Sequence, residues 1–183
     1  MDFTMNLTHV KLETGRLILR PWQENDLTDF YEYASVPGVG EMAGWKHHES
    51  MEESQRILKG FIENKNVFAI IYRENQKAIG SLGLHYSWAN DESVFKDLKL
   101  KEIGYVLSRE YWGKGLMPEA VKAVIDFCFY KCRMEALTIG HFSCNSQSRR
   151  VIEKCGFQFV KESQYYAKQL QKSFDDVKYI LYR

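Results

Sequence analysis

The sequence predicts an α/β domain built on one mixed sheet. Short β-favouring runs and amphipathic helical segments follow one another in the order β, α, α, β, β, β, α, β, α, β, β. The 183 residues suit one domain with a sizeable core, and 45% apolar and 14% aromatic residues are typical of a globular chain. Because no repeat, low-complexity stretch or domain boundary interrupts this order, we expect residues 1–183 to form a single domain.

The first third of the chain predicts a strand followed by two helices. Pro21 ends the strand, because proline cannot donate to a sheet ladder. Asn25 or Asp26 can cap the first helix, and Ser50 with Glu53 forms a capping box for the second. The expected elements are a loosely held N-terminal arm over residues 1–14, a strand over 16–21, a helix to about residue 35, a glycine-rich loop over 36–48 and a helix from 51.

Most of the expected strands lie further along the chain. Residues 74–76 form the turn of a hairpin, and residues 87–98 form a polar loop. Gly156 is the natural end of the last helix, because glycine accepts the left-handed conformation found there. Apart from the central segment, we expect strands over 67–72, 78–86, 136–142, 157–160 and 177–182, and a helix over 145–155.

The central segment, residues 101–126, combines a strand, a glycine turn and a helix. Gly113 and Gly115 cannot continue the strand comfortably, and Pro118 suits the first turn of a helix. Backbone N–H groups at such a turn bind phosphate oxygens, and glycines let the backbone come close. The spacing is neither that of the P-loop nor that of the G-x-G-x-x-G dinucleotide motif. An ordinary tight turn is the alternative.

Composition and charge exclude several classes of function. A formal net charge of +1 without a basic run argues against nucleic-acid binding. No apolar run is long enough to span a membrane, and no signal peptide is recognisable, so we expect a cytoplasmic protein. We expect no metal site, because the cysteines form no CxxC pair and the histidines complete no zinc pattern. The four cysteines, which we expect to be reduced, are Cys128, Cys132, Cys144 and Cys155.

Two stretches resemble the GNAT superfamily of N-acetyltransferases. Residues 112–117, Trp-Gly-Lys-Gly-Leu-Met, resemble its acetyl-CoA-binding motif Gln/Arg-x-x-Gly-x-Gly/Ala, with Trp112 and Met117 as departures. Residues 145–157 resemble the family's Asn-x-x-Ser/Ala…Glu-Lys-x-Gly-Phe segment. The Tyr-Trp-Gly-Lys-Gly form and residues 13–22 are similar to the ribosomal-protein N-terminal acetyltransferase branch, the RimJ/RimL-like enzymes. The resemblance implies a twisted, mostly antiparallel sheet of about seven strands with about four helices, splayed at its central parallel strands.

The resemblance also implies residues that bind acetyl-CoA as cosubstrate. A backbone N–H of Val106 or Leu107 would bind the acetyl carbonyl, and Asn145 would contact the pantetheine arm or the acetyl environment. Lys114 would face the phosphates as a point charge. The diphosphate would lie on the turn formed by Trp112, Gly113, Lys114, Gly115, Leu116 and Met117.

Three residues are the candidates for proton transfer, two as the base and one as the acid. An amine attacks a thioester only as the free base, and Glu102, on the strand that leads into the turn, is the candidate general base. Glu41 is its competitor, and solvent exposure or a pair with Lys101 is the alternative for Glu102. Many related enzymes carry a tyrosine acid at the position of Ile152, so Ser148 is the substitute that we expect at the leaving thiolate.

The expected reaction is direct acetyl transfer to a primary amine, with no metal and no covalent enzyme intermediate. A protein N-terminal α-amine is the leading acceptor, and a small-molecule amine such as a polyamine, an amino acid or an antibiotic is the alternative. The absence of tyrosine at position 152 leaves a second alternative, a non-catalytic CoA-binding sensor. A homodimer is possible, and neither nucleic acid nor membrane is expected as a partner.

Overall fold

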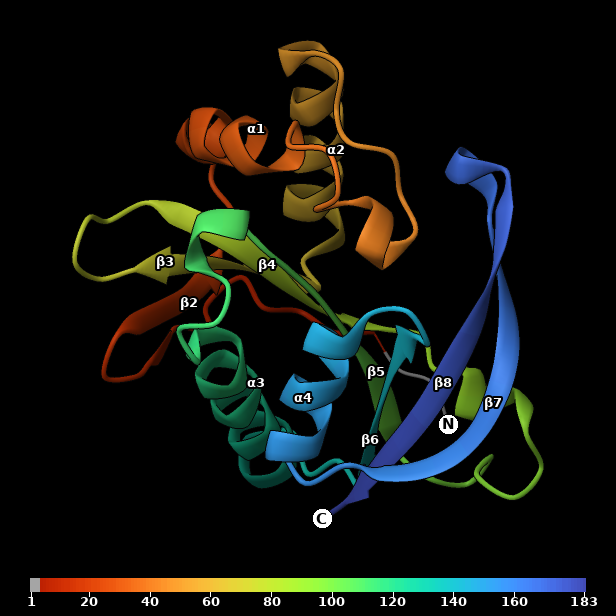
Figure 1. The fold of residues 1–183 in the computed structure, drawn as a ribbon. Coiled ribbons are helices and arrows are strands. Elements are labelled where there is room, and N and C mark those ends of the chain that lie inside the picture. The colour runs from red at the N-terminus through yellow and green to blue at the C-terminus, as the bar shows by residue number, and fades with distance from the viewer. Residues whose placement is uncertain (1–3) are drawn as a thin grey trace.

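The computed structural model describes residues 4–183, which form one eight-stranded sheet (Figure 1). The strand order is β1-β2-β3-β4-β5-β6-β8-β7, and within these residues only β5 and β6 pair in parallel. The expected mixed, mostly antiparallel sheet is confirmed, with eight strands in place of about seven. The strands are β1 (Leu12–Glu13), β2 (Leu17–Pro21), β3 (Val67–Tyr72), β4 (Ala78–His85), β5 (Leu100–Leu107), β6 (Ala136–Phe142), β7 (Gln158–Ala167) and β8 (Lys172–Tyr182).

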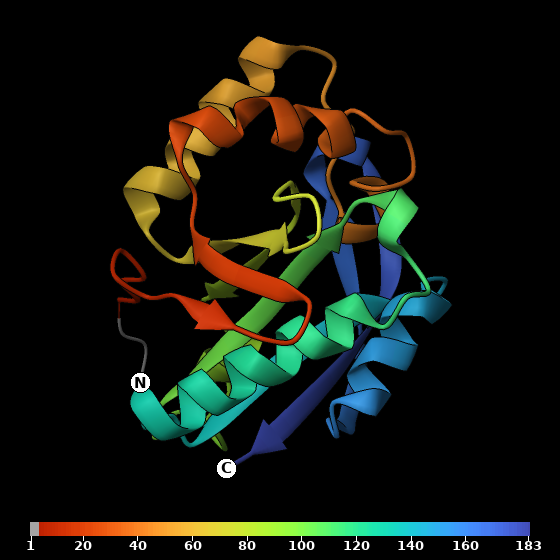
Figure 2. The ribbon, with the colours of Figure 1, turned by 90° about the vertical axis from the view of Figure 1, so that its left-hand side faces the viewer.

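Four α-helices flank the sheet, two on each side. Figures 1 and 2 show the first two helices together at the top, and the other two against the opposite face of the strands. The helices are α1 (Leu27–Ala34), α2 (Met51–Asn64), α3 (Leu116–Asp126) and α4 (Ser146–Lys154). Short helical turns are η1 (Glu24–Asp26), η2 (Glu41–Ala43), η3 (Trp88–Asp91), η4 (Arg109–Tyr111), the π-helical η5 (Phe127–Lys131) and η6 (Lys168–Leu170). No helix among the described residues is long and apolar enough to cross a lipid bilayer.

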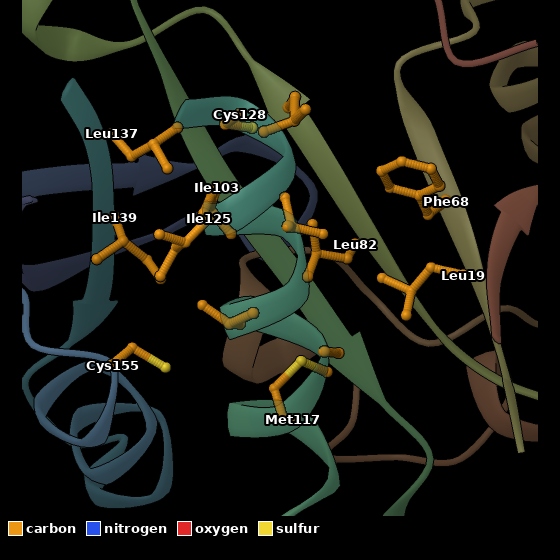
Figure 3. Packing of buried hydrophobic residues seen from close by; sticks show 14 of the residues in the cluster. Leu19, Phe68, Leu82, Ile103, Met117, Ile125, Cys128, Leu137, Ile139 and Cys155 are labelled. Atoms are coloured by element: carbon orange, nitrogen blue, oxygen red, sulfur yellow. The ribbon is translucent and has the colours of Figure 1, made fainter. Parts of the chain in front are cut away.

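Side-chain alternation along β3 fills a core on each face of the sheet. Phe68 and Ile70 point into the larger core under α3, whereas Ala69 and Ile71 point into the smaller core under α1 and α2. Figure 3 shows the larger core, where apolar side chains of α3 pack over the strands. Since each fully buried aliphatic or aromatic side chain stabilises the fold by about 1.5–3 kcal/mol, the two cores hold the helices to the sheet on both sides.

The sheet splays in the middle, at its parallel pair. β5 and β6 pair only from Leu100 with Ala136 to Ile103 with Ile139. Beyond Gly104, β5 continues to pair with β4, while β6 continues to pair with β8 as far as Phe142. A strand edge without a neighbour exposes backbone donors and acceptors, so this separation leaves such groups for a ligand.

Three expectations about the elements need correction. The residues that we expected to form a loosely held arm carry Met5 and Leu7, which are buried in the larger core, and β1; residues 1–3 lie outside the described part. The polar loop over 87–98 contains the turn η3. The last two strands are longer than expected, since β7 and β8 form a hairpin of 10 and 11 residues. Many residues of this hairpin are polar and partly exposed, so the sequence shows no alternation of apolar residues from which the full strands could be predicted.

Candidate active site

One large cleft opens where β5 and β6 part, and its volume is about 1430 Å³. Its lining comes from both faces of the sheet. On one side lie the turn before α3 and the first residues of α4. On the other side lie β4, β8 and the loop before α2. A cleft that passes between two strands can admit two reactants from opposite faces.

The turn before α3 presents free backbone donors to the cleft. Among residues 4–183, no group accepts a hydrogen bond from the backbone N–H of Gly113, Lys114, Gly115 or Leu116. Gly113 and Gly115 have φ angles of 75° and 73°, a left-handed conformation that favours glycine. Gly113, Gly115 and Leu116 also line the cleft. Free N–H groups at the N-terminus of a helix form a site suited to an anion such as phosphate.

Arg16, the residue just before β2, holds this turn in place. Its Nη1 donates to the Lys114 carbonyl at 2.9 Å, and its Nε donates to Glu119 Oε2 at 2.7 Å. The Thr14 hydroxyl donates to the other oxygen of the same carboxylate at 2.6 Å. Burial would raise the pKa of Glu119, but these hydrogen bonds outweigh burial and lower it. The carboxylate therefore stays ionised and joins the chain near residue 16 to the first turn of α3.

The exposed edge of β5 offers a donor at Leu107. The Ser108 N–H donates to the Ile79 carbonyl of β4 at 2.7 Å. N–H directions alternate along an antiparallel ladder, so the N–H of Val106 also faces β4, and that of Leu107 faces the gap. Of the two expected donors to the acetyl carbonyl, the alternation favours Leu107. Trp112 fixes this residue, because its Nε1 donates to the Leu107 carbonyl at 2.7 Å.

Ser148 lies in the cleft and shares a hydrogen bond with Tyr105. The two hydroxyl oxygens are 2.8 Å apart, and burial raises the pKa of the tyrosine. Ile152, at the position where related enzymes carry a tyrosine, is fully buried in the larger core and does not line the cleft. Helix α4 thus has no hydroxyl at position 152, and Tyr105 of β5 brings a hydroxyl to the same cleft.

The remaining residues that we expected to bind the cofactor have distinct surroundings. Asn145 is the N-cap of α4, not its first helical residue: its Oδ1 accepts from the Ser148 N–H at 3.1 Å. Its Nδ2 donates to the Met42 carbonyl at 3.4 Å. Met117 is buried at the cleft wall. Lys114 does not line the cleft, and its Nζ lies 5.0 Å from the centre of the Tyr111 ring.

Glu102 faces the other half of the cleft and lies close to a lysine. Its Oε1 is 3.6 Å from Lys178 Nζ, and its Oε2 accepts from the Trp88 N–H at 3.3 Å. Asp176 lies 2.7 Å from the same lysine. Burial raises the pKa of Glu102, with the positive Lys178 acting in the opposite direction. Burial lowers the pKa of Lys178, but the two carboxylates outweigh it, so the lysine stays charged. Two carboxylates and one ammonium give this half net negative charge.

Glu41 is less suited to be the base. It accepts hydrogen bonds from the Gly38 N–H at 2.7 Å and from the His47 N–H at 3.2 Å, and the His47 ring lies 2.8 Å away. Burial opposes these bonds, but they lower the pKa of the carboxyl. Glu41 does not line the cleft either. The structure thus favours Glu102 over its competitor.

Sequence reasoning missed several residues that the fold brings to the cleft. Tyr105 and Glu102 lie on the same strand but on opposite faces, and strand periodicity could have indicated this. No sequence signal places Asp176 and Lys178 beside Glu102, because β8 reaches the site through long-range pairing with β6. His85 was not among the predicted site residues, although it lines the cleft and is the partner of Glu102 in the pairing of β4 with β5. Within the described residues, no three His, Cys, Asp or Glu side chains gather as metal ligands.

Comparison with known proteins identifies one family. A family model described as an acetyltransferase (GNAT) domain matches residues 16–158. The chain is also similar to the uncharacterized N-acetyltransferase YoaA of Bacillus subtilis (strain 168). The two are 27% identical over 152 residues, which cover 80% of this chain and 82% of YoaA.

Solved structures share the fold at low sequence identity. The ribosomal-protein-S5-alanine acetyltransferase from Vibrio fischeri has a TM-score of 0.72 and 20% identity, over 94% of this chain and 96% of that one. The Microcin C7 self immunity acetyltransferase MccE, in complex with acetyl-CoA and AMP, has a TM-score of 0.77 and 17% identity, over 93% and 94% of the two chains. These likenesses concern the fold alone.

Proposed function

Because the chain belongs to the GNAT acetyltransferase family, we propose that it moves an acetyl group directly from acetyl-CoA to a primary amine in this cleft. One observation carries the proposal. Gly113, Gly115 and Leu116, whose backbone N–H groups are free, and the carboxylate of Glu102 line the same cleft, across the separation of β5 and β6. An anion site and a basic group then meet at one point, which suits direct transfer between two bound reactants.

The residues on the α3 side fit acetyl-CoA, which supplies the activated acetyl group as a thioester. The N–H groups of Gly113 to Leu116 would hold the diphosphate, and the charge of Lys114 would assist. The Leu107 N–H would donate to the acetyl oxygen as negative charge develops there. Asn145 would act chiefly by fixing the start of α4, since its carbonyl oxygen already caps that helix.

Glu102 is the proposed site for the proton of the acceptor amine. Asp176 and Lys178 balance each other, so the negative charge of Glu102 itself draws an ammonium ion, and burial gives its carboxylate the raised pKa that a general base needs. Ser148 and Tyr105 lie on the cofactor side, where their shared hydrogen bond would place a hydroxyl donor beside the leaving sulfur. The amine loses two protons in all, of which one goes to the CoA thiolate and one to solvent.

The N-terminal α-amine of a protein or peptide is the proposed acceptor. The fold is shared with a ribosomal-protein-S5-alanine acetyltransferase. Aromatic side chains from separate elements, Trp45, Trp88 and Tyr165, line the acceptor half of the cleft and could enclose the first side chain of a peptide. An α-amino group also titrates at about 8, nearer to neutral pH than the roughly 10.4 of a lysine, so less help is needed to free it.

A small-molecule amine is the second candidate, and one contact favours it. Gln169, at the tip of the β7–β8 hairpin, accepts a hydrogen bond from the Lys46 N–H at 3.0 Å. This bond joins the hairpin to the loop before α2. Both Gln169 and neighbours of Lys46 line the cleft. A closed rim of this kind suits a compact acceptor better than an extended chain.

A two-stage experiment tests the proposal. Calorimetry first measures the binding of acetyl-CoA. Release of thiol from acetyl-CoA is then followed with three amines: a short peptide with N-terminal alanine, spermidine and an amino acid ester. We expect tight binding and amine-dependent thiol release that is fastest with the peptide. Fastest release with spermidine or the ester would move the acceptor to the small-molecule class. Binding without amine-dependent release from any of the three would contradict the proposed transfer.

A further inference from the structure

The imidazole of His85 lies in the cleft without a hydrogen-bond partner among residues 4–183. The other two imidazoles that line the cleft are engaged. His48 Nδ1 is 2.6 Å from the Ser54 hydroxyl, and His141 contacts the Phe142 carbonyl and the Tyr179 hydroxyl at 2.7 and 3.2 Å. The His85 side chain is also exposed in the cleft. Neither of its ring nitrogens is therefore engaged in a hydrogen bond with the described part of the protein, and Nε2 is the ring atom that lies nearest to Gly83.

The ring packs over two glycines, and we call the space above them the seat of the ring. Gly83 on β4 and Gly104 on β5 are register partners, so they face each other across the two strands. A methyl group added to Gly83 would overlap His85 Nε2, and one added to Gly104 would lie 3.2 Å from His85 Cδ2. The three atoms nearest to the methyl group at Gly83, and the only two within 4 Å of the one at Gly104, belong to His85. The floor of the cleft thus has a space without side chains, and the imidazole fills it.

The seat lies between Glu102 and the point where the sheet opens. Glu102 is still within the paired part of β5 and β6, whereas Gly104 is the first residue of β5 beyond it. His85 and Glu102 are themselves register partners, so their side chains leave the same face of the sheet. A group at the opening of the sheet therefore meets the His85 ring before it meets the Glu102 carboxylate.

The charged groups around the ring come from several strands. Glu102 belongs to β5, and Asp176 and Lys178 belong to β8 beyond it. Lys101 lies on the opposite face of β5, and Tyr86 is the residue that comes directly after the end of β4. The protein around the cleft shields the ring partly from water and lowers the pKa of His85, and the charge of Lys101 lowers it further. The ring is therefore neutral at neutral pH and able to accept a proton.

We infer that His85 carries the proton of the acceptor amine to Glu102. The inference rests on the proposed acetyl transfer and adds a residue to it. The unprotonated ring nitrogen takes a proton from the ammonium ion, and the other ring nitrogen gives its own proton to the carboxylate through solvent in the cleft, since the ring and the carboxylate are not in direct contact. The amine becomes a free base, the ring returns to the neutral form as its other tautomer, and Glu102 becomes a neutral acid. Release of that proton to solvent restores the carboxylate.

Three variants test this relay with whichever amine of the panel is acetylated fastest. His85→Ala removes the ring, Gly83→Ala displaces it, and the double variant does both. General acid–base groups contribute roughly 10²- to 10⁴-fold, so we expect His85→Ala to lower kcat/KM by about 10²-fold with unchanged affinity for acetyl-CoA. Gly83→Ala should cause a similar loss. Adding it to His85→Ala should cost nothing more, because the vacated seat accepts the methyl group.

Added imidazole separates a chemical role from a structural one. The ring vacated in His85→Ala can be replaced from solution, so we expect free imidazole to restore part of the lost rate. His9→Ala is the control: this histidine is exposed and does not line the cleft, so neither a loss of rate nor a response to imidazole is expected.

The remaining outcomes distinguish a failure of the relay from a failure of the proposed acetyl transfer. If wild-type protein acetylates a panel amine and His85→Ala keeps its kcat/KM and pH profile, the relay is wrong and the transfer stands. A loss that imidazole does not restore, with additive effects of the two substitutions, also overturns the relay. If no panel amine is acetylated by the wild type, the proposed function fails and the relay with it.

Discussion

The hydroxyl of Tyr105 on β5 lies 2.8 Å from the hydroxyl of Ser148 on α4. This contact crosses from the sheet to a helix at the cofactor side of the cleft. A serine hydroxyl alone is a poor acid, because it does not ionise in the range where proteins work. A second hydroxyl in hydrogen-bond contact can orient the serine and pass a proton through it. We therefore propose that the pair takes the place of the single tyrosine that Ile152 replaces.

Tyr105→Phe tests the contribution of this contact. The substitution removes one hydroxyl and keeps the ring, so the loss is that of one hydrogen bond, about 1–1.5 kcal/mol. We expect kcat to fall about 10-fold with little change in KM for acetyl-CoA. Steady-state kinetics of Tyr105→Phe, Ser148→Ala and the double variant provide the measurement. The double variant should be little worse than Ser148→Ala, and strictly multiplicative losses would show that the two hydroxyls act separately.

Glu102→Gln tests the proposed acceptor of the amine's proton. Glutamine keeps the size of the side chain and cannot take a proton, so we expect kcat to fall by roughly 10²-fold or more. Burial raises the pKa of Glu102. As the pH is lowered, we therefore expect the activity of the wild type to fall at a higher pH than the ordinary pKa of a glutamate would give. The pH profile of kcat/KM measures this. A variant with the wild-type profile would remove Glu102 from the reaction.

The same raised pKa predicts an effect on stability. Between the unfolded and folded pKa values of Glu102, the folded state binds more protons, so the free energy of unfolding falls as pH rises through this window. Glu102→Gln does not titrate, so its melting temperature relative to wild type should rise between about pH 4 and pH 7. Thermal melts at these two values test the sign. A constant difference would show that burial does not govern this carboxylate.

Local chemistry explains which parts of the site were predictable from the sequence. Gly113, Gly115 and Pro118 have strong local preferences, so the turn and the start of α3 follow from a few adjacent residues. Glu102 was predictable because it is the carboxylate on the strand that leads into this turn. Such features need no knowledge of tertiary contacts.

The missed features depend on contacts between distant strands. The contact of Tyr105 with Ser148 joins residues 43 positions apart, and no sequence period links them. The seat of His85 depends on the register that sets Gly83 opposite Gly104. Pairing register is fixed by the packing of the whole sheet, so a single sequence does not show which two glycines face each other.

Gly115→Ala tests the anion site at the turn. The residue has a φ angle of 73°, where a side chain costs about 1–2 kcal/mol, so we expect the turn to relax and its N–H groups to lose their common direction. Calorimetry should show at least 10-fold weaker binding of CoA. Gly156→Ala is the matched control, because Gly156 has a φ angle of 84° with open space around it and does not line the cleft. We expect both variants to lose a similar amount of stability and only Gly115→Ala to bind CoA more weakly. Equal affinities of the two variants for CoA would contradict an anion site at this turn.

Arg16→Ala tests whether the turn depends on its support from the residue just before β2. The guanidinium holds both the Lys114 carbonyl and the Glu119 carboxylate, so its removal should let the turn move. The pair is partly exposed, and such ion pairs stabilise a fold by about 0–1 kcal/mol. We therefore expect a nearly unchanged melting temperature but about 10-fold weaker binding of CoA, because the N–H groups are no longer preorganised.

Arg73→Ala is the control for that experiment. Arg73 is exposed to a similar degree and donates to the Thr14 carbonyl at 2.9 Å, but it makes no contact with the turn before α3. Its removal should leave the affinity for CoA unchanged. Equal losses of affinity in the two variants would mean that general positive charge attracts CoA. Unchanged affinity in Arg16→Ala would mean that the turn keeps its shape through its glycines alone.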